Sequence, residues 1–315
     1  MNKNYGMEIV RATEIAALTA ARVQGLGNED EILNIARAAI TKTLNRLQIN
    51  GHLVNDRFTK REATIKIPTQ LGEGGPEMDL MAVALEGHHS AADGLNNATS
   101  YTVIASKDSI QSVPNLSMYK IVVGPKVGAV IDSNQPPTVN VKRVARSLRK
   151  YTDNVTVCIL NQARHQKLIK EVRSCGARIK LIEEGEISGC LSAITGEKAD
   201  IYMGYGFAPE GVLVAAAISC LGGYFEGKIF YENDRDREEA MEHGIYDFDK
   251  IFQAQDLIRT KEVAIAATGI TDGEFLEGVR FTSNGAITSS FIARGETFTH
   301  RKLETTHFFD YKPVF

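Results

Sequence analysis

The chain has 315 residues, a formal net charge of -3 and a hydrophobic fraction of 43%. The near-neutral charge excludes the basic composition of nucleic-acid binders and membrane-surface proteins, and no apolar stretch approaches the roughly 20 residues that span a bilayer. The N-terminal residues lack the apolar core of a signal peptide, and the cysteines are widely spaced, which favours a cytoplasmic protein with reduced thiols and, at this length, two domains.

Two helices are predicted first along the chain. The apolar spacing over residues 6–24 indicates a helix that ends at the following glycines. Asn28 is the predicted N-cap of a second helix, with Glu31 three residues later as in a capping box. Apolar positions with a 3.6-residue period predict that this helix continues as far as Asn50.

Short apolar or alternating runs between Gly, Pro and Asn predict strands in the rest of the first half. These runs are residues 52–56, 63–68, 79–85, 100–106 and 119–125. Residues 132–140 contain two adjacent prolines, which continue neither a helix nor a strand, and are the predicted linker. A basic amphipathic helix is expected next, either as a solvated face or as a surface for a partner or phosphate.

From residue 153 strands and helices alternate, which predicts a parallel sheet covered by helices, with ligands at the carboxyl ends of its strands. A charged loop over residues 231–240 leads to a strand at 262–271 and a strand-rich tail. We therefore predict an N-terminal α+β domain over residues 1–140 and a C-terminal α/β domain over residues 141–315.

Residues 203–217, "MGYGFAPEGVLVAAA", are the best local candidate for a ligand site. Glycines let a backbone approach a ligand, and the free N–H groups of a helix start attract phosphate. A simple strand-to-helix turn, with Glu210 complementing the helix dipole, explains the pattern equally well. His88 and His89 are adjacent, and on an extended backbone they would point to opposite sides, so we do not expect them to hold one metal ion.

Five stretches of the chain resemble the class II fructose-bisphosphatases, members of the lithium-sensitive, metal-dependent sugar-phosphatase group. They are residues 11–30, 120–132, 155–165, 205–217 and 267–279. The resemblance implies the layered α-β-α-β-α sugar-phosphatase fold with two α/β domains. It also implies hydrolysis of the 1-phosphate of a sugar bisphosphate, a step of carbohydrate metabolism and gluconeogenesis, with Mg or Mn held by carboxylates.

The same resemblance assigns five metal-binding carboxylates, of which this chain keeps Glu86 and Glu210. The other three positions hold Leu33, Arg57 and Val83. Leucine and valine cannot bind a metal ion, and an arginine places a permanent positive charge where the cation should lie.

Substrate contacts are also implied by the resemblance, and they are better retained. They fall on Arg164, Glu184, Gly185 and Glu186. Gly87, His88 and Arg57 complete the candidate substrate-binding set, with Arg57 as a counter-charge for the phosphate at a position where the resemblance places a metal ligand. His88 replaces a threonine of the family, Phe207 a ligand-contacting glycine, and Ser117 a tyrosine. The pocket is expected to survive in altered shape.

Two functions follow from these replacements. The first is a catalytically impaired or inactive paralogue that keeps a sugar-phosphate pocket and acts by binding or regulation, with Arg57, aided by Lys60 or Arg61, gripping the phosphate. The alternative is an active, divalent-metal-dependent fructose-bisphosphatase in which Glu86 and Glu210 hold one Mg or Mn ion. No residue is assigned a catalytic role. The expected assembly is a homo-oligomer or a hetero-oligomer with an active paralogue, without nucleic-acid or membrane partners.

Overall fold

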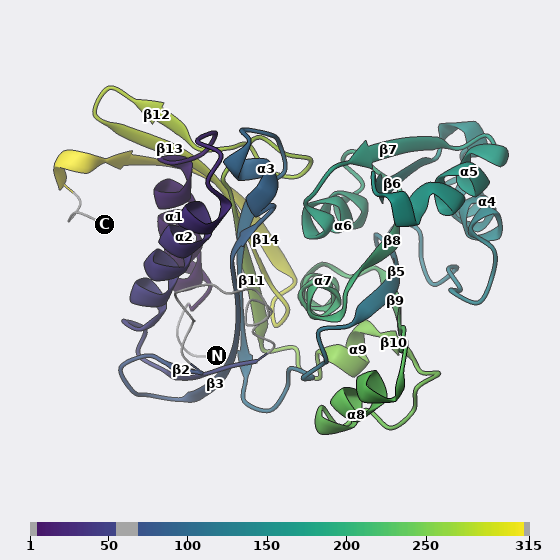
Figure 1. Ribbon diagram of the computed structural model, residues 1–315, viewed down its shortest axis with the longest axis horizontal. Helices are drawn as coiled ribbons and strands as arrows, with labels where there is room; N and C mark the ends of the chain where they lie inside the picture. The colour runs from purple at the N-terminus through teal and green to yellow at the C-terminus, as the bar shows by residue number, and fades with distance from the viewer. Residues whose placement is uncertain (1–4, 55–68, 312–315) are drawn as a thin grey trace. The chain divides into compact units, whose positions relative to one another are not determined.

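The computed structural model describes residues 5–54 and 69–311. The chain divides into two compact units, unit 1 with Met1–Ile110 and Thr260–Phe315, and unit 2 with Gln111–Arg259. Each unit has its own mixed sheet and its own helices, so the α/β fold class is confirmed (Figure 1). The division differs from the predicted boundary at residue 140, because the C-terminal strands return to the sheet of unit 1.

Unit 1 is built on a sheet whose described strands follow the order β12-β13-β11-β4-β3-β1-β2, with β14 paired to β13. β1 and β3 are parallel and the other neighbours are antiparallel. The strand-rich tail is confirmed, whereas the strand expected over residues 63–68 lies outside the described residues. The strands are β1 (Asn50–Leu53), β2 (Gln70–Leu71), β3 (Glu77–Glu86), β4 (Thr99–Ser106), β11 (Val263–Gly269), β12 (Arg280–Thr282), β13 (Gly285–Arg294) and β14 (Thr299–Phe308).

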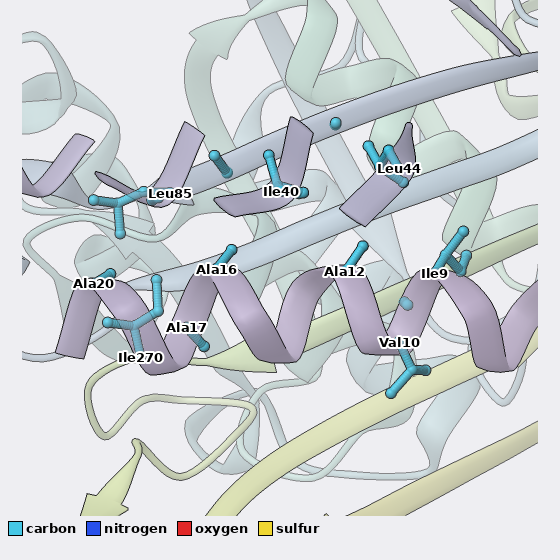
Figure 2. Close-up of a cluster of buried hydrophobic side chains, with 14 of the residues drawn as sticks. Ile9, Val10, Ala12, Ala16, Ala17, Ala20, Ile40, Leu44, Leu85 and Ile270 are labelled. Atoms are coloured by element: carbon cyan, nitrogen blue, oxygen red, sulfur yellow. The ribbon is translucent and has the colours of Figure 1, made fainter. Parts of the chain in front are cut away.

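Helices α1 (Tyr5–Ala21) and α2 (Glu29–Leu44) pack side by side against this sheet (Figure 1). Figure 2 shows Ala12 and Ala16 of α1 pointing toward Ile40 and Leu44 of α2. Alanines at this contact let the two helix axes approach closely, because the axial distance depends on the side chains between them. No helix in residues 5–54 or 69–311 is both long and apolar enough to cross a membrane.

The predicted cap of α2 is confirmed, and its predicted end is wrong. The Glu31 backbone N–H donates to Asn28 Oδ1 at 3.1 Å, and Asn28 Nδ2 donates to the Glu31 carboxylate at 3.0 Å. The helix ends at Leu44 rather than near residue 50. Leu47 and Ile49 keep the apolar pattern going after the helix because both turn into the core ahead of β1.

Unit 2 has a sheet in the order β10-β9-β5-β8-β6-β7. Only β6–β7 and β6–β8 are parallel among these neighbours. The prediction of a parallel sheet is therefore wrong for three of the five pairings, because β5 inserts antiparallel between β8 and β9, and β10 pairs antiparallel with β9. The strands are β5 (Ser117–Val123), β6 (Thr156–Leu160), β7 (Arg178–Ile182), β8 (Ile201–Phe207), β9 (Tyr224–Ile229) and β10 (Ile251–Gln253).

Helices cover both faces of the sheet of unit 2 (Figure 1). α4 (Pro137–Leu148) and α5 (Gln166–Ser174) lie on one face, and α6 (Glu186–Thr195) and α7 (Ala208–Leu221) lie on the other. The expected charged loop contains α8 (Asp234–Glu242), because Asn233 accepts from the Asp236 backbone N–H and starts a helix there. The short helices are α3 (His88–Ala92) and α9 (Ala254–Leu257).

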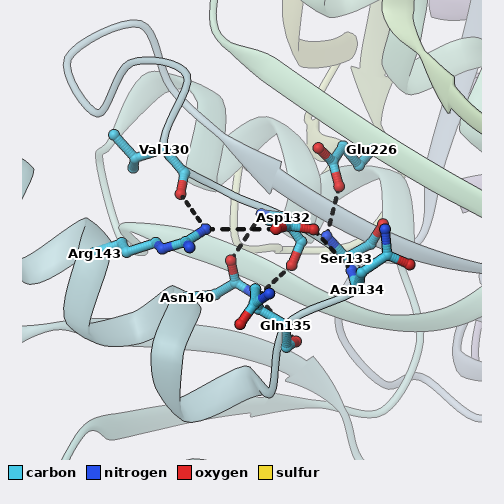
Figure 3. Close-up of polar contacts among 8 residues, drawn as sticks. All are labelled: Val130, Asp132, Ser133, Asn134, Gln135, Asn140, Arg143 and Glu226. Carbon is cyan, nitrogen blue, oxygen red and sulfur yellow. Dashed lines mark hydrogen bonds and ion pairs between the residues drawn. The ribbon is translucent and has the colours of Figure 1, made fainter.

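Residues 132–140, predicted as a linker, belong to unit 2 and are held there by hydrogen bonds (Figure 3). Asn140 of α4 accepts from the Asp132 backbone N–H at 2.8 Å and donates to the Asp132 carbonyl at 2.9 Å. The Ser133 N–H donates to Glu226 on β9 at 2.6 Å. Pro136 and its neighbour start α4, since the first turn of a helix needs no N–H from proline.

Candidate functional site

The retained Glu86 ends strand β3 in unit 1, where the pairing with β4 shifts register between Val83 and Glu86. Such a bulge re-aims the side chains that follow it. Gly87 then adopts a left-handed conformation with φ 78° as the N-cap of α3. A Cβ at Gly87 would lie 3.1 Å from the Asn97 carbonyl oxygen, so both the backbone conformation and the packing favour glycine.

Two positions to which the resemblance assigns metal-binding carboxylates are apolar and buried in this chain. Leu33 of α2 is 5% exposed and belongs to the core of unit 1, and Val83 of β3 is 3% exposed. Neither side chain carries an oxygen that could bind a metal ion. Arg57, at the third of these positions, lies outside the described residues, as do Lys60 and Arg61.

His88 and His89 do not lie on an extended backbone, which corrects the expectation that they point to opposite sides. They open helix α3, and both rings approach Glu29 in the first turn of α2. His89 Nδ1 lies 2.8 Å from Glu29 Oε1, and His88 Nε2 lies 3.5 Å from Glu29 Oε2. Successive side chains on a helix are separated by about 100°, which lets both rings reach one carboxylate.

In unit 2 the central feature is a lysine that the sequence analysis did not single out. Lys120 of β5 is 0% exposed, and its Nζ lies 2.7 Å from Glu186 Oε1 and 3.9 Å from Glu210 Oε2. The same Nζ donates a hydrogen bond to the Phe207 carbonyl oxygen at 2.7 Å. The sequence did contain a signal for this contact, since Lys120 lies inside the apolar run at residues 118–123. A lysine in a buried strand needs a partner for its charge.

Glu186 is the first residue of α6, after Gly185 with φ 84°, and it is 3% exposed. Its carboxylate lies against Gly206 of β8, where a Cβ would be 1.6 Å from Glu186 Oε2. Burial raises the pKa of Glu186 well above its usual range, the charge of Lys120 lowers it, and the charge of Glu210 raises it further.

Glu210 caps the helix predicted at the strand-to-helix turn. Its Oε2 accepts from the Phe207 backbone N–H at 2.8 Å, and the residue is 5% exposed. The turn predicted at residues 203–217 is therefore present as β8 followed by α7. Glu210 serves there as a helix cap with a lysine beside it.

The remaining predicted substrate residues of unit 2 are more accessible. Arg164 is exposed on a short 3-10 helix (Ala163–His165), and Glu184 is half-buried ahead of α6. Next to Arg164, the His165 ring is buried, and its Nε2 accepts from the Tyr205 backbone N–H at 2.7 Å. Ser117 and Phe207, the two positions where the resemblance implies other ligand-contacting residues, are cross-strand partners on β5 and β8.

A separate cavity of about 350 Å³ lies in unit 2 beside β9 and α9, and its lining includes none of the predicted site residues. Ala129 and Ile131, in the loop that leads to Asp132 in Figure 3, contribute to the wall of this cavity. The lining consists of Ala129, Ile131, Ile218, Gly223, Tyr224, Phe225, Glu226, Gln253, Ala254 and Gln255.

A family model described as bacterial fructose-1,6-bisphosphatase, glpX-encoded, matches residues 3–307. The chain belongs to this family. It is 34% identical to the D-fructose 1,6-bisphosphatase class 2/sedoheptulose 1,7-bisphosphatase of Synechococcus sp. (strain JA-2-3B'a(2-13)), over 98% of this chain and 97% of that protein. Proteins with the same name are 33% identical in Synechococcus sp. (strain JA-3-3Ab), over 98% and 97% of the chains, and 32% identical in Synechococcus elongatus, over 98% of both.

The fructose-bisphosphatase family is metal-dependent, and at two of the positions where the resemblance places carboxylates this chain has the buried residues Leu33 and Val83. No group of three or more His, Cys, Asp and Glu side chains in residues 5–54 and 69–311 could hold a metal ion. Of the two retained carboxylates, Glu86 belongs to unit 1 and Glu210 to unit 2. The residues brought together inside unit 2 are Glu186, Glu210 and Lys120.

Proposed function

We propose that this member of the class II fructose-bisphosphatase family binds a sugar phosphate, hydrolyses it slowly or not at all, and acts by binding or regulation. The observation that carries the proposal is the burial of Leu33 and Val83, which are 5% and 3% exposed where the family resemblance places carboxylates. Metal-assisted hydrolysis needs oxygen ligands that hold a cation and generate hydroxide, and these two side chains supply none.

Phosphate binding without a metal ion is assigned to arginine. The Arg164 guanidinium is exposed in unit 2, and Arg57 is a second candidate. A guanidinium binds phosphate through two parallel hydrogen bonds, but it cannot lower the pKa of water as a metal ion does. The ligand class is a sugar phosphate, and the names of the relatives specify two sugar bisphosphates. The proposed setting is the cytoplasm, as a homo-oligomer or with an active paralogue.

An active fructose-bisphosphatase is the second candidate. The retention of Glu86 and Glu210 favours it, together with the activity in the names of the relatives. In that case one Mg or Mn ion would be held by few protein ligands and by water, which Mg tolerates. The binding protein and the active enzyme would bind the same class of sugar phosphate, and they differ in the rate at which they hydrolyse it.

Phosphate release from fructose 1,6-bisphosphate and sedoheptulose 1,7-bisphosphate, with Mg or Mn, tests the proposal directly. We expect turnover far below the roughly 1 to 1000 per second of ordinary enzymes.

Calorimetric titration with the same sugar bisphosphates in EDTA should still detect binding. Arg164→Gln should weaken that binding roughly 10- to 100-fold, because a charge-assisted hydrogen bond is lost. Arg173→Gln, an exposed arginine on α5, is the matched control. Ordinary turnover would establish the second candidate instead.

Restoring the carboxylates is the complementary experiment. The triple variant Leu33→Asp, Arg57→Glu, Val83→Asp should gain Mg-dependent phosphate release over the parent protein. Without metal it should be less stable, because two charged side chains then replace apolar ones in buried positions. The matched control is Leu33→Asn, Arg57→Gln, Val83→Asn, which keeps the shapes without the charge. Equal activity in both triple variants would argue against metal binding as the missing function.

A further inference from the structure

The ammonium group of Lys120 lies among three oxygens from two helices and one turn. They are Glu186 Oε1 at 2.7 Å, the Phe207 carbonyl oxygen at 2.7 Å, and Glu210 Oε2 at 3.9 Å. The side chain of Lys120 is 0% exposed, and the two glutamates are 3% and 5% exposed. The lysine comes from β5, the glutamates lie in the first turns of α6 and α7, and Phe207 ends β8.

Both peptide groups of Phe207 are held by this cluster. Its N–H donates to Glu210 and its carbonyl oxygen accepts from Lys120. Glu186 lies against Gly206, the preceding residue, in a space that a Cβ would fill. The turn from β8 into α7 is therefore contacted by all three charged side chains.

Charge balance makes Lys120 the key member of the cluster. Two carboxylates that are buried near each other repel and are poorly solvated, and one ammonium among them offsets both effects. Removing one partner of a buried ion pair is strongly destabilising, because the remaining charge stays buried without compensation.

We propose that Lys120 is a positioning residue: its ammonium is the fixed counter-cation of Glu186 and Glu210 and holds the β8–α7 turn in place without a metal ion. Any effect of Lys120 on sugar-phosphate binding rests on the proposed function, in which Glu186 is a candidate substrate-binding residue. The positioning role itself requires no ligand.

Lys120→Met tests the charge, because methionine keeps the aliphatic stem and removes the ammonium. We expect a melting temperature roughly 10 °C lower than that of the parent protein. Adding Glu186→Gln to this variant should restore a substantial part of the loss, because the surplus negative charge is removed. Lys126→Met, an exposed lysine in the same unit, is the control and should leave the melting temperature unchanged.

A melting temperature of Lys120→Met within about 2 °C of the parent would overturn the proposal, since the lysine would then only fill space. If Lys120→Met fails to fold, the double variant Lys120→Met, Glu186→Gln distinguishes charge balance from packing. Folding of the double variant supports charge balance, and its failure to fold indicates that packing is the cause.

The variant Lys120→Ala allows a second test, in which an added cation takes the place of the missing ammonium. A lysine that only filled space would give no such rescue. The substitution removes the ammonium and leaves three oxygens around a small space, which suits a hard cation. Millimolar MnCl₂ or methylammonium chloride should raise the melting temperature of Lys120→Ala by several degrees and leave the parent protein unchanged. No rise in the variant, or an equal rise in the parent protein, would contradict an anionic cage around Lys120.

Binding measurements separate this inference from the proposed function. Lys120→Met should weaken the binding of fructose 1,6-bisphosphate in EDTA at least 10-fold if the turn shapes the site. If the parent protein binds no sugar phosphate, the proposed function fails, and the melting temperatures still decide the role of Lys120.

Discussion

His165 follows β6, and its buried ring accepts a hydrogen bond from the Tyr205 backbone N–H at 2.7 Å. An accepting ring nitrogen must be unprotonated, so this contact requires neutral histidine. Burial, together with the charge of Arg164, lowers the pKa of His165 to about 4. The same side chain in the unfolded chain titrates near 6.5.

Stability should therefore depend on pH through His165. Between pH 6.5 and pH 4 the unfolded state binds more protons than the folded state, so the free energy of unfolding falls as the pH falls. The full loss is at most about 3 kcal/mol, and it is absent above pH 6.5. Urea unfolding at pH 7 and pH 5 should show a smaller difference for His165→Gln than for the parent protein. His300→Gln, at an exposed histidine, should keep the parent's difference, and an unchanged difference in His165→Gln would exclude His165 as its source.

At the scale of elements, α2 shows how a local signal and a tertiary contact cooperate. Its N-terminus is fixed by Asn28 through a hydrogen bond to the Glu31 N–H, and three acidic residues in the first turn suit the helix dipole. One of them, Glu29, also contacts His88 and His89 at the start of α3. The cap of α2 and the turn after Glu86 are thus coupled through one glutamate.

Removing the cap should lower the stability of α2. Asn28→Ala is expected to cost about 1 kcal/mol of the free energy of unfolding, because the Glu31 N–H loses its acceptor. Asn28→Ser keeps a side-chain oxygen at this position and should cost little. Equilibrium unfolding in urea measures both variants. Equal losses in the two variants would show that the asparagine acts by something other than capping.

For the whole molecule, the path of the chain decides which segments can fold alone. Unit 2 is one continuous segment whose ends meet, because the Gln111 N–H donates to the Leu257 carbonyl oxygen at 2.8 Å. It has its own apolar core between the sheet and helices α4 and α5. Unit 1 needs both ends of the chain, because β11 pairs with β4 and β13 pairs with β11.

A fragment of residues 111–259 should therefore fold by itself. We expect an α/β circular dichroism spectrum and one cooperative urea transition. A fragment of residues 1–140, the domain predicted from the sequence, should not fold, because β4 lacks its neighbour β11 and the start of unit 2 lacks its sheet. Cooperative unfolding of the 1–140 fragment would show that the observed division does not reflect independent stability.

Sequence patterns predicted the site only in part. The turn from β8 into α7 was readable from residue types. The assignment of Glu86 and Glu210 as metal carboxylates, and of Leu33 and Val83 as their replacements, rests on the family resemblance and stays a prediction. The partner of a buried charge was not readable. Lys120 lies 66 residues before Glu186 and 90 before Glu210 in the chain, and spacing gives no signal for contacts at such separations.

By itself, the sequence determined the family. It also determined helix α1, helix α2 with its Asn28 cap, and most strands, because these depend on local periodicity and local hydrogen bonds. Only the tertiary structure decided the antiparallel insertion of β5, the return of β11 to unit 1, and the burial of Glu186 beside Lys120. Periodicity shows which side chains face a core. It does not show which distant segment forms the other side of that core, and that choice depends on pairing and packing across the whole unit.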